Sequence, residues 1–154
     1  MKAPAVIALD YYYAHSPSKV WRALTDPELH ALWWAAGDIR AVVGHRFELD
    51  MGPWGKQPCE VLEVEHERRL RYRFATGSLD TTITWDLVPE GSGTRLKLTH
   101  EGFNLDSPLG RKALEGMRPG WPKVLGRLET VLAVLSSKQQ DWHREFGARP
   151  GRTP

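Results

Sequence analysis

The stretch that decides the fold is WPKVLGRLETVLAVL, residues Trp121 to Leu135, near the end of the 154-residue chain. Its apolar side chains recur every three or four residues, as along one stripe of an α-helix: Trp121, Val124, Leu125, Leu128, Val131, Leu132 and Leu135. A helix of about 15 residues spans roughly 22 Å, the breadth of the sheet in a small domain. The rest of the chain must therefore supply the apolar surface that this stripe covers.

Between residues 38 and 102 the apolar residues recur at every second position, which predicts an antiparallel meander with one apolar face. Turn signals such as Gly52-Pro53-Trp54-Gly55 and Thr76-Gly77-Ser78 separate the predicted strands. The apolar positions alternate with polar ones: Phe47, Leu49 and Met51; Leu70, Tyr72 and Phe74; Ile83, Trp85 and Leu87; Leu96 and Leu98. We expect this apolar face to receive the C-terminal helix.

The N-terminal part predicts one strand, residues 6–13, followed by two short helices. Ser16-Pro17 is a typical helix start, and Asp26-Pro27 ends the first helix and caps the second. Ser107-Pro108 predicts a short helical piece to about Met117, and the prolines at 119 and 122 predict a break before the long helix. Such a loosened start would let the long helix act as a lid. Residues 1–137 are expected to form one domain, with 138–154 as a polar, flexible tail.

Composition excludes several classes of protein. The hydrophobic content of 41% is that of a globular domain, and the net charge of +2 lacks the basic excess of a dedicated nucleic-acid binder. The apolar runs are too short to span a bilayer, and the N-terminus does not read as a leader peptide, so we expect a cytoplasmic location. One cysteine, Cys59, provides neither an internal disulfide nor a thiolate cluster.

The sequence resembles a known family in several stretches. These are VWRALTDPELHALWW, VVGHRFELDMG, CEVLEVEHERRLRYRF, GTRLKLTHEGF and RPGWPKVLGRLETVL. Together they resemble the START-like (SRPBCC) superfamily, and more narrowly the branch of activator of Hsp90 ATPase homologue 1-like domains, over residues 7–135. The resemblance implies an α+β helix-grip fold of the Bet v 1 type, in the order strand, two short helices, six-strand meander and long C-terminal helix. It also implies an apolar cavity between the curved sheet and that helix.

Bulky side chains from separate segments are expected to line this cavity. Gly126 would thin the helix at mid-length, with close packing or a bend as compensation for its poor helix propensity. His100 is in phase with Leu96 and Leu98, so it is either a polar group of the cavity that orients a ligand or serves as acid or base, or a buried, hydrogen-bonded histidine. The predicted ligand-binding residues are Trp33, Phe47, Met51, Tyr72, Phe74, Trp85, His100, Phe103, Trp121, Leu125 and Leu128.

The leading functional hypothesis is non-catalytic binding of a small hydrophobic or amphipathic molecule. The alternatives are a cyclase- or dehydratase-like enzyme that uses the same cavity, and a chaperone-interacting module of the Hsp90 activator type. The sequence contains no catalytic motif, and its six histidines never recur at i, i+4, so we expect no metal and no cofactor. A chaperone or a second copy of the chain is the alternative partner. Arg68, Arg69, Arg71 and Arg73 are expected to form a salt-bridged, solvated face rather than a nucleic-acid surface.

Overall fold

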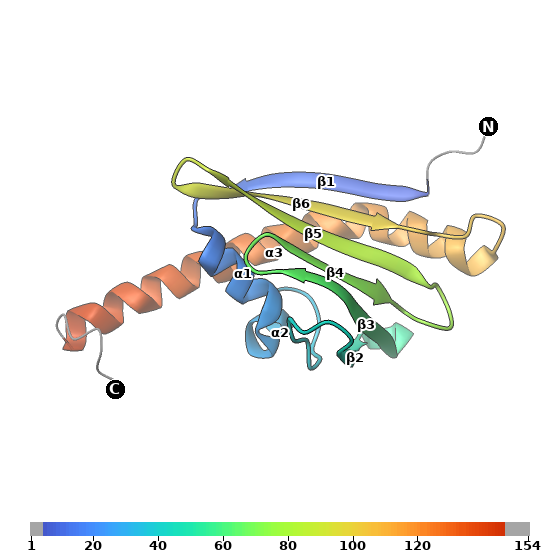
Figure 1. The fold of residues 1–154 in the computed structure, drawn as a ribbon, viewed down its shortest axis with the longest axis horizontal. Helices are drawn as coiled ribbons and strands as arrows, with labels where there is room; N and C mark the ends of the chain where they lie inside the picture. Colours follow the sequence, from blue (N-terminus) through green and yellow to red (C-terminus); the bar gives the residue numbers. More distant parts are fainter. Residues whose placement is uncertain (1–4, 147–154) are drawn as a thin grey trace.

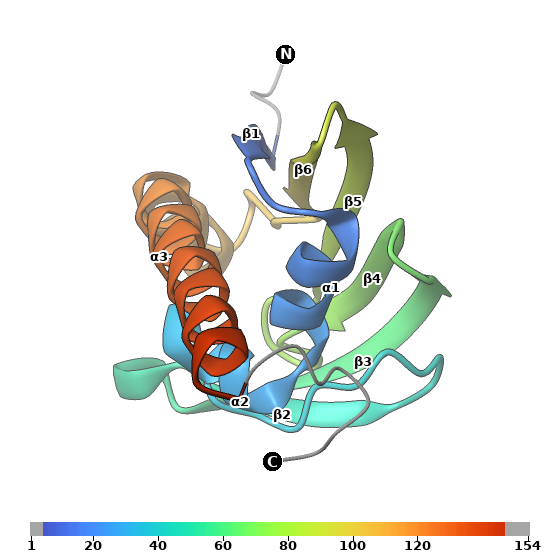
Figure 2. The same cartoon turned by 90° about the vertical axis from the view of Figure 1, so that its left-hand side faces the viewer.

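The computed structural model describes residues 5–146, with side chains for residues 5–135. The elements in chain order are β1 (Val6–Tyr13), α1 (Pro17–Thr25), α2 (Pro27–Trp33), β2 (Arg46–Asp50), the 3-10 helix η1 (Gly52–Trp54), β3 (Lys56–Glu65), β4 (Arg69–Phe74), β5 (Thr81–Glu90), β6 (Gly93–Glu101) and α3 (Pro108–Phe146). A curved antiparallel sheet lies against the long helix α3, with α1 and α2 beside them (Figures 1 and 2). This is the predicted helix-grip fold.

The sheet has six strands in the order β1-β6-β5-β4-β3-β2. Strands β2 to β6 form a meander of neighbours, and β1 pairs antiparallel with β6 at one edge. The prediction of a six-strand meander after the short helices is therefore wrong by one strand. The sixth strand is β1, which precedes the helices and reaches the sheet by pairing with the last strand of the meander (Figure 1).

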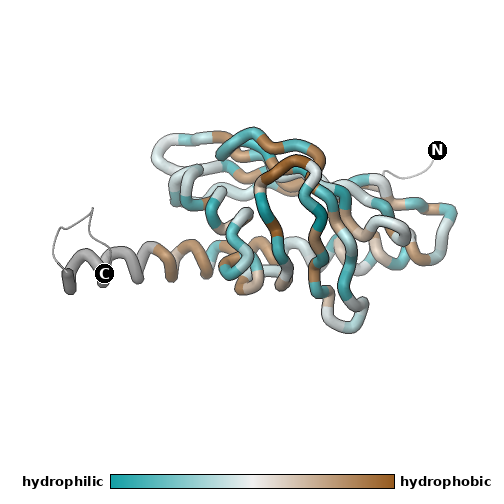
Figure 3. The backbone as a smooth tube through the Cα atoms, turned by 60° about the horizontal axis from the view of Figure 1, so that its bottom comes forward, coloured by the Kyte–Doolittle hydropathy of each residue, from teal (hydrophilic) through white to brown (hydrophobic). Residues whose placement is uncertain are grey.

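The predicted alternation along the strands is confirmed, and apolar and polar positions follow one another along the chain in Figure 3. In β4, Leu70, Tyr72 and Phe74 are buried whereas the intervening arginines are exposed. Register places Arg73 opposite Glu60 on β3. Arg69 Nε lies 2.6 Å from Asp86 Oδ1, and its Nη1 lies 3.7 Å from Glu63 Oε1. Arg69 thus forms the salt bridges expected for the charged face.

Both short helices begin where their caps predict. Ser16 Oγ accepts a hydrogen bond from Lys19 N at 3.3 Å, and Asp26 Oδ1 accepts one from Glu28 N at 2.9 Å. Each cap satisfies a backbone N–H group that has no partner inside its helix. The two helices bury one face each, and Trp33 at the end of α2 is completely buried.

The predicted break in the C-terminal helix is wrong. Helix α3 is continuous over 39 residues and contains both Pro119 and Pro122. Each proline removes a single N–H donor from the helical series, and the helix packs into the core before and after the prolines, at Leu114 and Leu125. Tyr13 Oη, from β1, donates a hydrogen bond to Leu125 O at 2.8 Å. The helix also continues past Leu135 to Phe146. Residues 147–154 of the expected tail lie outside the described residues, and the flexibility of the tail stays a prediction.

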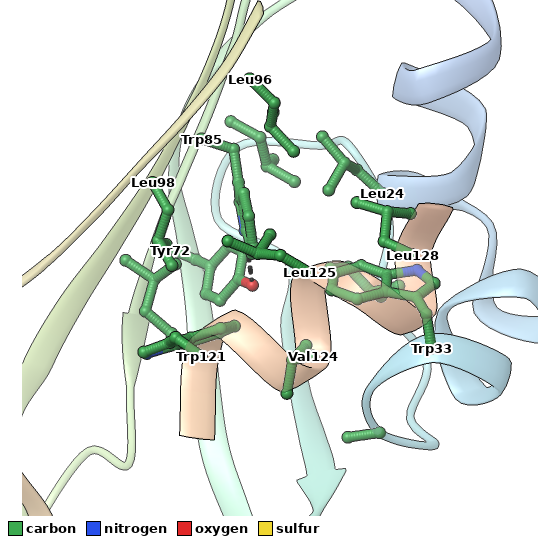
Figure 4. Packing of buried hydrophobic residues seen from close by; sticks show 14 of the residues in the cluster. Leu24, Trp33, Tyr72, Trp85, Leu96, Leu98, Trp121, Val124, Leu125 and Leu128 are labelled. Carbon is green, nitrogen blue, oxygen red and sulfur yellow. Dashed lines mark hydrogen bonds between the residues drawn. The ribbon is translucent and has the colours of Figure 1, made fainter. Parts of the chain in front are cut away.

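The middle of the space between sheet and helix is filled by large side chains (Figure 4). The rings of Trp33 and Trp121 each lie 5.6 Å from that of Trp85, edge to face. Their polar atoms have partners: Trp33 Nε1 donates to Ala23 O at 2.8 Å, and Trp85 Nε1 donates to Tyr72 Oη at 3.0 Å. These contacts close the core at its centre.

Within the described residues, we find no helix whose length and apolarity would let it cross a bilayer.

Candidate ligand-binding pocket

A pocket of about 730 Å³ opens at one end of the sheet, between the start of α3, the η1 turn and the β4–β5 turn. These three segments lie at the same end of the molecule in Figure 1. Pockets that bind small molecules typically measure about 300–1,000 Å³ and are mostly apolar. The lining residues are Met51, Trp54, Gln57, Phe74, Ser78, Leu79, Leu109, Lys112, Ala113, Glu115, Gly116 and Met117.

One wall is a face of α3. Leu109, Ala113, Gly116 and Met117 recur at helical spacing and lie on the pocket side. A Cβ added at Gly116 would meet no atom within 4 Å. Glycine at this position therefore relieves no steric conflict, and it leaves the middle of the wall open. The start of this wall is fixed by Gly110, where a Cβ would overlap the backbone carbonyl of Asn104.

The opposite wall comes from two connections of the sheet. Gln57 Nε2 donates to the Trp54 carbonyl at 2.7 Å, and Ser78 Oγ donates to Gln57 Oε1 at 3.4 Å. This pair of bonds ties the β4–β5 turn to the η1 turn. Because these polar groups bond to each other, the apolar surface of this wall comes from the side chains of Met51, Trp54 and Leu79.

Phe74 lies in the lining, and a hydrogen-bonded histidine lies behind it. The ring of His100 is 5.7 Å from that of Phe74. Trp121 Nε1 donates to His100 Nδ1 at 3.1 Å, so the ring proton is on Nε2, which lies 2.8 Å from Thr81 Oγ1 and donates to it. The Thr81 hydroxyl donates in turn to the Phe74 carbonyl at 3.4 Å.

Burial lowers the pKa of His100 from its ordinary 6.5 to about 3, which keeps the imidazole neutral. Both ring nitrogens have partners within the protein, and His100 is fully buried. Of the two interpretations left open by the sequence, the buried, hydrogen-bonded histidine describes this geometry. Direct orientation of a ligand by His100 stays a prediction.

The structure brings only part of the predicted site to the pocket. Met51 and Phe74 line it, and the other nine predicted residues belong to the core, each at most 6% exposed. Those nine are Trp33, Phe47, Tyr72, Trp85, His100, Phe103, Trp121, Leu125 and Leu128. The aromatic rings fill the space where the cavity was expected, so the open volume lies nearer the end of the sheet.

Sequence reasoning missed most of the lining. The stretch LGRKALEGM places Leu109, Ala113 and Met117 at i, i+4 and i+8, a helical face that should have indicated a partner surface. The role given to Gly126 is also corrected. Gly126 is exposed and a Cβ there would meet no atom within 4 Å, so it is not closely packed. Gly116 is the helix glycine that faces the pocket.

Cys59 and Tyr72 are buried and are not among the lining residues, although Cys59 pairs with Phe74 across the strands. Burial raises the pKa of the Cys59 thiol to about 12, and Tyr72, whose hydroxyl accepts the Trp85 hydrogen bond, has its pKa raised by the same cause. In the part of the chain whose side chains are described, no three His, Cys, Asp or Glu residues are placed to hold a metal ion. The charged residues of the lining are Lys112 and Glu115, both exposed.

Comparison with known proteins gives a family and several solved relatives. The family model described as activator of Hsp90 ATPase homolog 1-like protein matches residues 14–133. Protein MLL2253 from Mesorhizobium loti, whose crystal structure is known, is 34% identical in sequence to this chain and superposes on it with a TM-score of 0.73. The match covers 83% of this chain and 96% of MLL2253. Protein NE0264 from Nitrosomonas europaea is 25% identical, and the match covers 89% of this chain and 99% of NE0264 with a TM-score of 0.73. CalU16 from Micromonospora echinospora is 25% identical, and the match covers 96% of this chain and 91% of CalU16 with a TM-score of 0.67. No curated protein matches the chain.

Proposed function

The chain belongs to the family of activator of Hsp90 ATPase homolog 1-like proteins, and we propose that it binds a small hydrophobic or amphipathic molecule in the pocket at the start of α3. The observation that carries the proposal is the pocket itself, which is open, mostly apolar in its lining residues and bordered by a face of α3 that has Gly116 in the middle of the wall. The molecule would contact Met51 and Phe74, with the other predicted residues forming the packed wall behind them. The expected cytoplasmic location is part of this proposal.

Apolar burial would supply most of the affinity. Each 100 Å² or so of apolar ligand surface removed from water contributes about 2.5 kcal/mol before the costs of association. Lys112 and Glu115 belong to the lining and are exposed. They can therefore contact the polar end of an amphipathic ligand while that end stays hydrated. This arrangement favours a ligand that enters with its apolar part toward Phe74.

We propose binding without chemical conversion because a cyclase- or dehydratase-like reaction needs a polar pair held against the substrate inside the cavity. His100 and Cys59 are ionisable groups next to Phe74. Both His100 nitrogens are hydrogen-bonded, to Trp121 and Thr81, and burial raises the pKa of the Cys59 thiol to about 12, which keeps it protonated. The charged groups of the lining, Lys112 and Glu115, are exposed. Solvated side chains of this kind are poorly suited to hold a reacting atom in place.

Occlusion of the pocket tests the proposal. Gly116→Phe would place a ring in the pocket without displacing the backbone, because the position is open. Gly126→Phe is the matched control, since it makes the same change on the exposed side of the same helix. With anilinonaphthalene sulfonate as the fluorescent probe, we expect Gly116→Phe to weaken binding at least about tenfold and Gly126→Phe to leave it within about twofold. Equal affinity in the two variants would reject the pocket as the binding site.

Chaperone activation is the second candidate function, and the description of the family supports it. It predicts that the purified chain changes the ATPase rate of Hsp90 in a concentration-dependent way. An unchanged rate at a large molar excess of the chain would reject this candidate. The pocket proposal would stand in that case, because it requires no protein partner.

A further inference from the structure

Trp54 is exposed in a way that the fold does not require. It lies on η1, where no residue is buried, and its 68% exposure is the highest among the large hydrophobic side chains that the structure describes. A tryptophan side chain is a large, mostly apolar surface, and leaving it in water forgoes the free energy of burial. Trp54 nevertheless belongs to the pocket lining. Its apolar surface is therefore available to a bound molecule.

The backbone holds Trp54 at this position through two glycines. Gly52 and Gly55 have φ values of 63° and 79°, the left-handed region that favours glycine. A Cβ at either position would meet no atom within 4 Å, so backbone conformation rather than crowding requires glycine there. Gly55 N–H donates to Gly52 O at 2.9 Å and closes the turn. The Trp54 carbonyl is fixed by Gln57, which also bonds Ser78 across the pocket wall.

An apolar side chain of α3 complements Trp54. Leu109, in the first turn of the helix, is 48% exposed and also lines the pocket. The pocket thus has an exposed indole on its sheet side and an exposed aliphatic group on its helix side. An indole face makes favourable offset-stacked contact with another flat π-system, which it cannot make with a flexible alkyl chain.

We infer that Trp54 is a ligand-contacting, specificity-determining residue, which stacks on a flat ring of the bound molecule and selects ring-bearing amphipathic ligands over flexible acyl chains. This inference rests on the proposed function, since it assigns the ligand class of the same pocket. Ring stacking contributes beyond the area that it buries. Replacing the indole with an apolar but non-aromatic side chain should therefore lower the affinity for a flat ligand selectively.

The test compares two probes on three proteins. The probes are anilinonaphthalene sulfonate, which carries a flat two-ring system, and dodecanoate, which carries a flexible chain; the proteins are wild type, Trp54→Leu and Trp54→Phe. We expect Trp54→Leu to weaken binding of the ring probe by roughly 3- to 10-fold, the range expected for loss of one aromatic contact. The affinity of Trp54→Leu for dodecanoate should differ from that of wild type by less than about twofold. Trp54→Phe should retain most of the affinity for the ring probe.

Two results would overturn the inference: an unchanged affinity of Trp54→Leu for the ring probe, or an equal loss for both probes. Each of these results is distinguishable from failure of the proposed function. If the proposed function fails, Gly116→Phe binds the ring probe as tightly as wild type does. If Gly116→Phe loses binding and Trp54→Leu does not, the pocket binds ligands without selection by Trp54.

Discussion

Acidification should destabilise the folded protein through two buried neutral histidines. His30 and His100 are both fully buried, and burial lowers their pKa values from 6.5 to about 4 and about 3. The unfolded chain takes up protons at these side chains near pH 6.5, whereas the folded protein does not. Stability is therefore complete above about pH 6.5 and decreases as the pH falls toward the folded pKa values.

The magnitude follows from proton linkage. Between about pH 7.5 and about pH 5.5, each histidine of this kind lowers the free energy of unfolding by about 1.4 kcal/mol, and the two together by about 3 kcal/mol. Urea unfolding followed by tryptophan fluorescence at each pH measures the change. In His100→Phe, the loss between the two pH values should be smaller than in wild type by about 1.4 kcal/mol, whatever the starting stability of the variant. A pH dependence identical to that of wild type would refute the assignment of His100 as a buried neutral group.

Three further changes test the packing. Gly126→Ala should raise the free energy of unfolding by up to about 1 kcal/mol, because the position is exposed and open within a helix; an unchanged thermal midpoint would contradict this. Gly37→Ala should lower the free energy of unfolding by about 1–3 kcal/mol, because a Cβ there would overlap the backbone carbonyl of Glu48. An unchanged free energy of unfolding in urea would contradict this. Combining His100→Phe with Trp121→Phe should destabilise less than the sum of the single changes, by about 1 kcal/mol, since the indole N–H is then not left unpaired; strict additivity would exclude the hydrogen bond as a stabilising contact.

Much of the fold could be predicted from the sequence because periodicity reports which face of an element is buried. Leu70, Tyr72 and Phe74 alternate with exposed arginines, and all three are buried. Trp121 and Leu128 belong to the helical stripe, and both are in the core. Such patterns need only a period of two or 3.6 residues, so they can be recognised without knowledge of the partner surface.

The pocket could not be predicted in the same way. Its walls bring Trp54 and Phe74 together with Leu109 and Gly116, residues far apart in the chain. Which bulky side chains fill the core and which border open space depends on how the rings of the core pack together. Local propensity also failed at Pro119, where the continuous helix overrides the expected break. Both errors have the same cause, since tertiary packing decided between local alternatives that the sequence left open.

Native mass spectrometry of freshly purified protein tests the central claim most directly. After addition of anilinonaphthalene sulfonate, wild type and Gly126→Phe should each carry one bound probe molecule, and Gly116→Phe should be observed without it. The variants differ from each other only in the α3 position that receives the ring, which is in the pocket lining at 116 and outside it at 126. Retention of the probe by Gly116→Phe, or its absence from wild type, would contradict a ligand-binding pocket at the start of α3.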